Sequence, residues 1–152
     1  MDESARKVKI FAAGTFDIIH VGHIRFLYAA KGLAENSELI VVVARDKTVE
    51  RLKGHKPIFS ELERLEIVSA LKPVDKAILG SDSENIFEVL REIRPDIVAL
   101  GYDQKVSEED LISWANRHGL KFRIVRLPKF DAGICSSSEV RQRIQKNIPS
   151  DT

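Results

Sequence analysis

Five short, strongly apolar segments alternate with segments of helical periodicity along this 152-residue chain. The apolar segments are rich in β-branched residues and are too short for helices, which predicts strands that are covered on both faces. Turn residues or helix-start signals follow each of them. We therefore predict strands at 8–14, 38–44, 76–80, 96–101 and 121–127.

The segments between these strands show helix signals. Ser60 and Glu63, for example, have the spacing of a capping box. Proline or glycine follows several of the segments, as Pro73 and Gly119 do, and such residues end helices. We predict helices over about 21–35, 60–72, 81–94, 107–119 and from about 136 onward.

The regular alternation of strands and helices determines the expected architecture. Parallel strands joined by helices require right-handed crossovers, which place helices on both faces of one sheet. No internal repeat, low-complexity tract or linker interrupts the pattern. We predict one α/β domain over 1–152, a doubly wound, Rossmann-like fold whose five-stranded parallel sheet has the order 3-2-1-4-5.

Composition narrows the class of protein. Lys and Arg number 24 against 23 Asp and Glu, and this balance argues against a general nucleic-acid-binding protein. The one cysteine, Cys135, excludes an internal disulfide framework and fits a reducing compartment. No signal-peptide pattern is present, and the longest apolar run, 39–44, is far shorter than the roughly 20 residues of a membrane helix. We expect a cytoplasmic protein without nucleic-acid or membrane partners.

Three segments rich in glycine and polar residues follow predicted strands. They are 14–23 ("GTFDIIHVGH"), 101–104 ("GYDQ") and 129–138 ("KFDAGICSSS"). Ligands of doubly wound sheets bind beyond the carboxyl ends of the strands, where the strand order reverses. We therefore expect the three segments on one rim of the sheet.

The first of these segments combines a glycine-containing turn with His20 and His23 at a helix start. Backbone N–H groups of the turn and the positive end of the helix form a phosphate cradle. The i, i+3 spacing puts both imidazoles on one face, where each could donate to a phosphate oxygen. The alternative is that the histidines only cap the helix; a zinc site is disfavoured because no further set of ligands is apparent. The glycine patterns of P-loops and of dinucleotide-binding folds are absent.

Segment 14–23 resembles the form Gly-Thr-Phe-Asp-x-x-His-x-Gly-His of the HxGH motif, which the cytidylyltransferase-like branch of the nucleotidyltransferase superfamily carries. The stretches "ARDKTV", "RLKGHKP", "ELER", "KPVDKAILG" and "LGYD" and a serine-rich tail follow in the order of that family. The resemblance implies that a phosphate of an acceptor attacks the α-phosphate of a nucleoside triphosphate in line, and that pyrophosphate leaves. Such a reaction needs the protein to position the substrates and to neutralise charge more than to form covalent bonds with them.

The resemblance also implies roles for particular residues. His20 and His23 would stabilise charge on the α-phosphate and the departing oxygen, and Lys53 would add a mobile positive charge. Mg²⁺ or another divalent cation would be bound mainly through the phosphates, without protein ligands. The candidate nucleotide-binding residues are Gly14, Thr15, Phe16, Val21, Gly22, Gly101, Tyr102, Asp103, Lys129, Ser136, Ser137 and Ser138.

For some of these candidate residues the sequence also allows a purely structural role. Tyr102 could stack and Asp103 could accept from a ribose hydroxyl or a base amine, or both could belong to an ordinary surface loop. The serines at 136–138 could bind the β- and γ-phosphates or serve only as a helix cap. Cys135 beside them is either an oxidation-prone thiol near the triphosphate or a small buried side chain.

Two departures from the cytidylyltransferase pattern concern the base and the acceptor. "GYDQ" stands where cytidylyltransferases have Gly-Asp-Asp-Trp, and the tail lacks their Arg-Thr-Glu. Together with "GTFD", "VARD" and "CSSS", these features resemble the archaeal-type FAD synthetases, which implies an FMN adenylyltransferase with ATP and FMN as substrates, and a homodimer. The alternatives are a cytidylyltransferase for glycerol 3-phosphate or another small phospho-alcohol, and a nucleotide-binding module without turnover.

Overall fold

The computed structural model of the chain describes residues 6–82, 85, 87–130 and 137–147. These residues form a five-stranded parallel sheet in the order β3-β2-β1-β4-β5. The strands are β1 (Val8–Gly14), β2 (Ser37–Val43), β3 (Lys76–Leu79), β4 (Ile97–Leu100) and β5 (Arg123–Arg126). The predicted fold class and strand order are confirmed, and every strand end lies within two residues of its predicted position.

The helices of the described part are α1 (Val21–Lys31), α2 (Asp46–Lys53), α3 (Glu61–Ser69), α4 (Val89–Ile93), α5 (Glu108–Arg117) and α6 (Ser137–Asn147). Two predicted helix starts are confirmed by their caps. The hydroxyl of Ser60 accepts from the N–H of Glu63, and that of Ser107 from the N–H of Asp110, both at 3.2 Å. Within the described residues, no helix has the length and apolar character needed to cross a membrane.

The helices differ most from the prediction in three places, and α3 also ends at Ser69, three residues before its predicted end. The prediction lacks α2, which is short and charged and has only two apolar residues, Val49 and Leu52, too few to mark a helix in the sequence. α1 ends at Lys31, four residues before the predicted end, where Gly32 interrupts it. α4 begins at 89 instead of near 81, because the side-chain oxygen of Asn85 accepts the N–H of Phe87 at 3.0 Å and holds a turn there.

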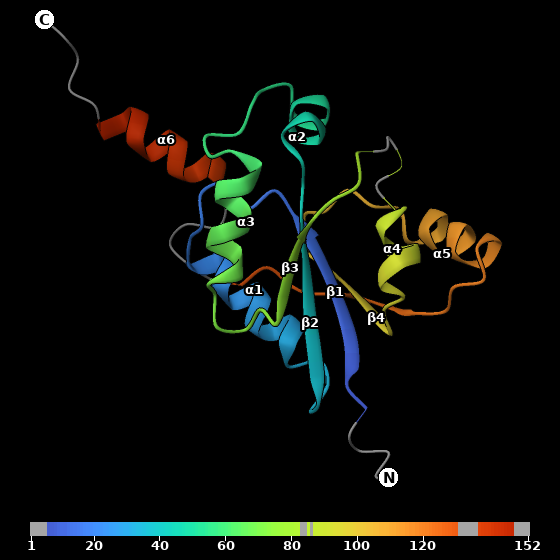
Figure 1. Cartoon of the computed structure of the whole chain (residues 1–152). Coiled ribbons are helices and arrows are strands. Elements are labelled where there is room, and N and C mark those ends of the chain that lie inside the picture. The colour runs from blue at the N-terminus through green and yellow to red at the C-terminus, as the bar shows by residue number, and fades with distance from the viewer. Residues whose placement is uncertain (1–5, 83–84, 86, 131–136, 148–152) are drawn as a thin grey trace, which may run out of the picture.

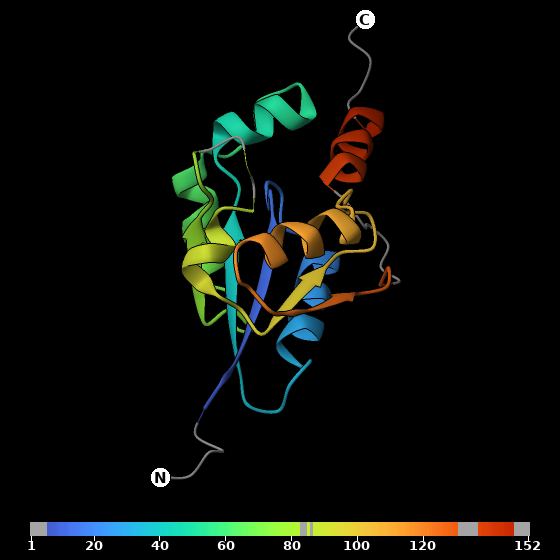
Figure 2. The same cartoon turned by 90° about the vertical axis from the view of Figure 1, so that its right-hand side faces the viewer.

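Helices cover both faces of the sheet, with α1 and α3 on one face and α4 and α5 on the other (Figure 1). Figure 2 shows α4 and α5 in front of the sheet and α1 behind it. Alternate residues of β1 divide between the two cores: Ile10 packs with Leu27 and Val68, whereas Phe11 packs with Trp114. This double coverage explains why the central strands are almost continuously apolar.

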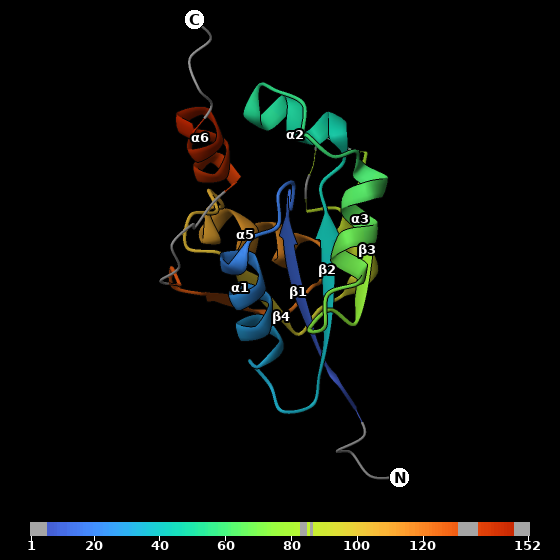
Figure 3. The ribbon, with the colours of Figure 1, turned by 90° about the vertical axis from the view of Figure 1, so that its left-hand side faces the viewer.

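The strand order reverses between β1 and β4, where doubly wound sheets bind their ligands. β1 pairs with β2 as far as Gly14 and Val43, whereas its pairing with β4 ends at Ala12 and Ala99. The two central strands therefore part at their carboxyl ends. α2 and α6 both lie beyond this end of the sheet (Figures 1 and 3).

Candidate active site

The chain leaves β1 through a tight turn at Gly14, Thr15 and Phe16. The φ angle of Phe16 is 53°, in the left-handed region that bulky residues rarely adopt, and its side chain is buried. The ring lies over Gly14, where an added Cβ would stand 2.9 Å from it. A side chain at Gly14 would displace the ring, so this position needs glycine.

His20 and His23 form the cap at the start of α1. Nδ1 of His20, the N-cap residue, accepts the backbone N–H of Gly22 at 3.1 Å. Nδ1 of His23 accepts the N–H of His20 at 3.2 Å, so two imidazoles complete a reciprocal capping box. Helix capping, the alternative role weighed from the sequence, is therefore present, but it uses only one nitrogen of each ring.

The cap determines where each imidazole carries its proton. A backbone N–H can only donate, so Nδ1 is unprotonated in both rings and the hydrogen of each neutral ring is on Nε2. Burial lowers the pKa of His20, while the Glu139 carboxylate acts in the opposite direction. Burial, with the charges of His20 and Lys53, lowers the pKa of His23 to about 4. At neutral pH both rings are therefore neutral donors through Nε2–H.

Nε2 of His20 is buried and finds no hydrogen-bond partner among the described residues. A buried N–H group without an acceptor costs about 1–3 kcal/mol, and native proteins leave few of them. An anionic oxygen beside the cap would satisfy it, and the positive end of α1 favours such an anion. The cap is thus chemically suited to a phosphate.

Lys53, at the end of α2, acts electrostatically on the histidine cap. Lys53 lies in the exposed last turn of α2, and its charge contributes to the lowered pKa of His23. Gly54 follows with a φ angle of 77°, a left-handed conformation that ends the helix without strain in glycine. The charge of Lys53 thus acts on the histidine cap, although the three predicted catalytic residues come from the segments after two different strands.

The buried Arg64 of α3 fixes the position of α2. Its side chain is 0% exposed, and Nη2 donates to the carboxylate of Asp46, at the start of α2, at 2.8 Å. Nη1 donates to the carbonyl of Thr15 at 2.7 Å, and Nε donates to that of Phe59 at 2.9 Å. One guanidinium therefore joins the turn after β1 to the starts of α2 and α3.

Asp17 connects the same turn to α6. Its carboxylate is 3% exposed and accepts the N–H groups of Ile58 and Phe59 at 2.8 and 2.9 Å. Arg141 of α6 forms an ion pair with this carboxylate. A buried charge is tolerated when it is paired and hydrogen-bonded in this way. α6 is therefore anchored beside the histidine cap.

The loop after β4 is joined to the carboxyl end of β1. Gln104 joins them, because its Oε1 accepts the N–H of Gly101 at 2.8 Å and its Nε2 donates to the carbonyl of Ala13 at 2.9 Å. The second predicted rim segment, 101–104, is therefore joined to β1 at the residue directly before the first segment.

The predicted nucleotide-binding side chains of this loop are accessible. Tyr102 is 41% exposed, and Asp103 is exposed as well. Nζ of Lys129 lies 5.9 Å from the centre of the Tyr102 ring, within the range of a cation–π contact. The rim thus presents an aromatic face, a carboxylate and a cation.

The serine-rich tail is only partly described. Ser136 and Cys135 lie outside the described residues, so their roles stay predictions. Ser137 is the first residue of α6, and Ser138 is exposed in its first turn. Val21, at the start of α1, is 45% exposed.

Nothing in the sequence indicates that Asp17, Gln104 and Arg141 hold the site together. Their main partners lie 41, 91 and 124 residues away along the chain, so no local pattern indicates them. Arg64 did give a signal, because it lies four residues before the buried Val68, on the apolar stripe of its helix.

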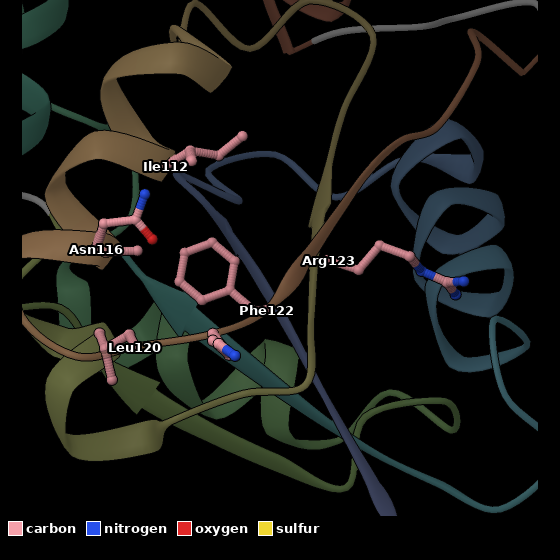
Figure 4. Close-up of a pocket in the computed structure, with 7 residues that line it drawn as sticks. Ile112, Asn116, Leu120, Phe122 and Arg123 are labelled. Carbon is pink, nitrogen blue, oxygen red and sulfur yellow. The ribbon is translucent and has the colours of Figure 1, made fainter.

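A hollow of about 530 Å³ lies elsewhere on the surface, between α5 and β5. Ile112, Asn116 and Phe122 line it (Figure 4). Arg123, also in the lining, pairs with Ile97 at the amino end of β4. The hollow is therefore at the other end of the sheet from the histidines and does not belong to this site.

Comparison with known proteins agrees with this geometry. A family model described as cytidylyltransferase-like matches residues 11–143. A protein of Thermoplasma acidophilum named FAD synthase is 49% identical over 141 residues, which cover 93% of this chain and 96% of that protein. An FAD synthase of Archaeoglobus profundus is 51% identical over 144 residues, which cover 94% of this chain and 90% of that protein.

A solved structure is similar over most of its length. The crystal structure of the lipopolysaccharide core biosynthesis protein from Thermoplasma volcanium matches with a TM-score of 0.76 and 47% identity. The match covers 82% of this chain and 98% of that one. It supports the Rossmann-like architecture described above.

Proposed function

This chain belongs to the cytidylyltransferase-like family, and from that premise we propose that it is an FAD synthase, which transfers AMP from ATP to FMN and releases pyrophosphate. The observation that carries the proposal is the buried Nε2 of His20, which has no partner among the described residues and lies beside His23. A module that only binds a nucleotide gains little from a lysine whose charge acts on one of two capping histidines. A transferase needs such donors and such a cation beside the α-phosphate and the departing oxygen, where negative charge develops during the reaction.

In this reaction a phosphate oxygen of FMN attacks the α-phosphorus of ATP. The new bond forms while the bond between the α-phosphorus and the bridging oxygen to the β-phosphate breaks. Negative charge grows on the α-phosphate oxygens and on the departing oxygen, to which Nε2–H of His20 and His23 donates. The cap orients both rings before ATP binds, so little reorganisation is needed during the reaction. Lys53 neutralises part of the charge on the triphosphate.

The remaining predicted residues bind the rest of the nucleotide. Tyr102 and Asp103 would contact the base and ribose of ATP, with Lys129 beside them. Ser136, Ser137 and Ser138 would donate to the β- and γ-phosphates from the start of α6. The anchoring of α6 through Arg141 and Asp17 supports this placement, because it fixes that helix next to the cap.

A divalent cation, Mg²⁺ in the simplest case, completes the proposal. The donor set fits a cation carried by the phosphates: the cap offers N–H groups, and no three His, Cys, Asp or Glu side chains among the described residues gather to hold a metal ion. Such a cation would neutralise charge on the triphosphate. We further propose a homodimer in the cytoplasm, on the family resemblance and on the single Cys135.

The experiment that tests the function is a grid of ATP and CTP against FMN and glycerol 3-phosphate, read by pyrophosphate release and by chromatography of the product. His20→Asn protein, purified in parallel, measures any contaminating activity. We expect FAD from ATP and FMN alone, with the variant close to background. Turnover of CTP with glycerol 3-phosphate would indicate a cytidylyltransferase, and ATP binding without pyrophosphate release in any arm would indicate a nucleotide-binding module.

A further inference from the structure

The side chain of Gln104 spans the point at which the two central strands part. The N–H of Gly101 can only donate and the carbonyl of Ala13 can only accept, so their contacts determine which end of the amide is oxygen and which is nitrogen. The contacts measure 2.8 and 2.9 Å, good lengths for N–H···O bonds. Ala13 and Gln104 are 91 residues apart along the chain.

These hydrogen bonds link β1 to the end of β4 beyond the last backbone pairing of the two strands. The pairing of β1 with β4 ends at Ala12 and Ala99. The amide of Gln104 joins the next residue of β1 to the residue that follows β4. It thus connects two strand ends that no longer pair directly, and so controls how far they separate.

Arg126 of β5 holds the same loop from its other side. Nη1 donates to the carbonyls of Gly101 and Gln104, both at 2.9 Å, and Nη2 donates to that of Val106 at 3.1 Å. Tyr102 and Asp103 lie between these fixed points and remain exposed. The backbone that carries both side chains is therefore constrained from two directions.

We propose that Gln104 is a positioning residue for the nucleotide: its amide sets the spacing between the histidine turn and the Tyr102–Asp103 corner, and thereby the affinity for the nucleoside triphosphate. The inference rests on the proposed function only in naming ATP as that triphosphate. One ligand of limited length must reach both the cap with its phosphates and the corner with its base, so a change in this spacing weakens triphosphate binding. The acceptor need not contact the corner, so its binding should change little.

The test compares wild-type protein with Gln104→Met, which keeps the length of the side chain and removes both hydrogen bonds. Gln142→Met, at an exposed position of α6, is the matched control. Dissociation constants for Mg²⁺-ATP and Mg²⁺-CTP are measured by calorimetry without acceptor, and KM values for ATP and FMN are then measured in turnover. Gln104→Glu is the second variant: its carboxylate can still accept from Gly101 but cannot donate to Ala13, and it serves if the methionine variant does not fold.

We expect the Gln104 variants to bind ATP about tenfold more weakly, the effect of losing one to two hydrogen bonds, with KM for FMN changed less than about twofold. The control should match wild type. An unchanged dissociation constant for ATP in a variant of lowered melting temperature would overturn the inference and leave Gln104 a purely structural residue. If CTP binds in place of ATP and is weakened by the same substitution, the inference holds while the proposed function fails. If wild-type protein binds neither nucleotide, both fail.

Discussion

The N–H of His20 donates to Nδ1 of His23 at 3.2 Å, and the centres of the two rings lie 3.9 Å apart. The cap is therefore built from the same side chains that are proposed to contact ATP. Each ring uses one nitrogen for the helix and leaves the other for the ligand. Structural and chemical roles of these histidines can consequently be separated by substitution.

Replacing His20 by Asn or by Gln should have opposite effects. The oxygen of Asn can take the place of Nδ1, so His20→Asn should keep the cap and the stability but lower the rate by roughly two to three powers of ten. The nitrogen of Gln extends to the position of Nε2, so His20→Gln should lose about 1 kcal/mol of cap stability yet react faster than His20→Asn. Urea unfolding and single-turnover FAD formation measure the two effects. Full activity in the stable Asn variant would show that capping is the only role of His20.

The ionisation of His23 should be visible directly. Because burial and two neighbouring charges lower its pKa from 6.5 to about 4, the folded protein binds fewer protons than the unfolded chain between these values. Stability should therefore fall as the pH falls from about 6.5 toward 4. Nitrogen-15 NMR of the imidazoles should show hydrogen on Nε2 at pH 7, and His23→Asn should flatten the decline of stability with pH. A His23 that titrates near 6.5 would contradict this description of the cap.

Lys53 should act on the histidines and on the rate together. Lys53→Met removes a positive charge that lowers the pKa of His23, so that pKa should rise. The rate should fall by about one to two powers of ten, less than for a fixed donor. Lys47→Met, at an exposed position in the first turn of the same helix, is the matched control and should change neither quantity. Equal effects of the two substitutions would mean that Lys53 contributes only to net charge.

The ion pair of Arg64 with Asp46 should matter for stability. Asp46→Ala leaves the fully buried guanidinium without its carboxylate and should lower the free energy of unfolding by about 2 kcal/mol. Asp82→Ala removes an exposed carboxylate from Arg45, which also pairs with Glu61, and should cost less than about 0.5 kcal/mol. Denaturant unfolding at one pH compares them. Similar losses in both variants would show that the burial of Arg64 has no energetic consequence.

Much of the fold follows from local patterns. Strands covered on both faces must be apolar throughout, and the capping serines at 60 and 107 mark their helices correctly. Local patterns do not predict α2, because tertiary contacts hold this helix. The carboxylate of Asp46 accepts from Arg64, and the N–H of Asp46 donates to Glu61. Both partners lie outside α2, so the sequence of this helix alone does not indicate either contact.

The candidate site also contains residues that local sequence indicates and residues that it does not. His20 and His23 are recognisable because the predicted catalytic motif and the helix cap lie within the same four residues. Asp17, Gln104 and Arg141 are not, because each acts on a segment that only folding brings near. Local sequence therefore indicates the residues proposed to contact the ligand better than it indicates the residues that hold them in place.

The most direct test of the account is a crystal structure with a non-hydrolysable ATP analogue whose α,β-bridging oxygen is replaced by a methylene group. We expect Nε2 of His20 and of His23 within hydrogen-bonding distance, about 2.7–3.2 Å, of oxygens of the α-phosphate or β-phosphate. A triphosphate bound elsewhere, or rings whose Nε2 atoms face protein groups while the analogue is bound, would contradict the central claim.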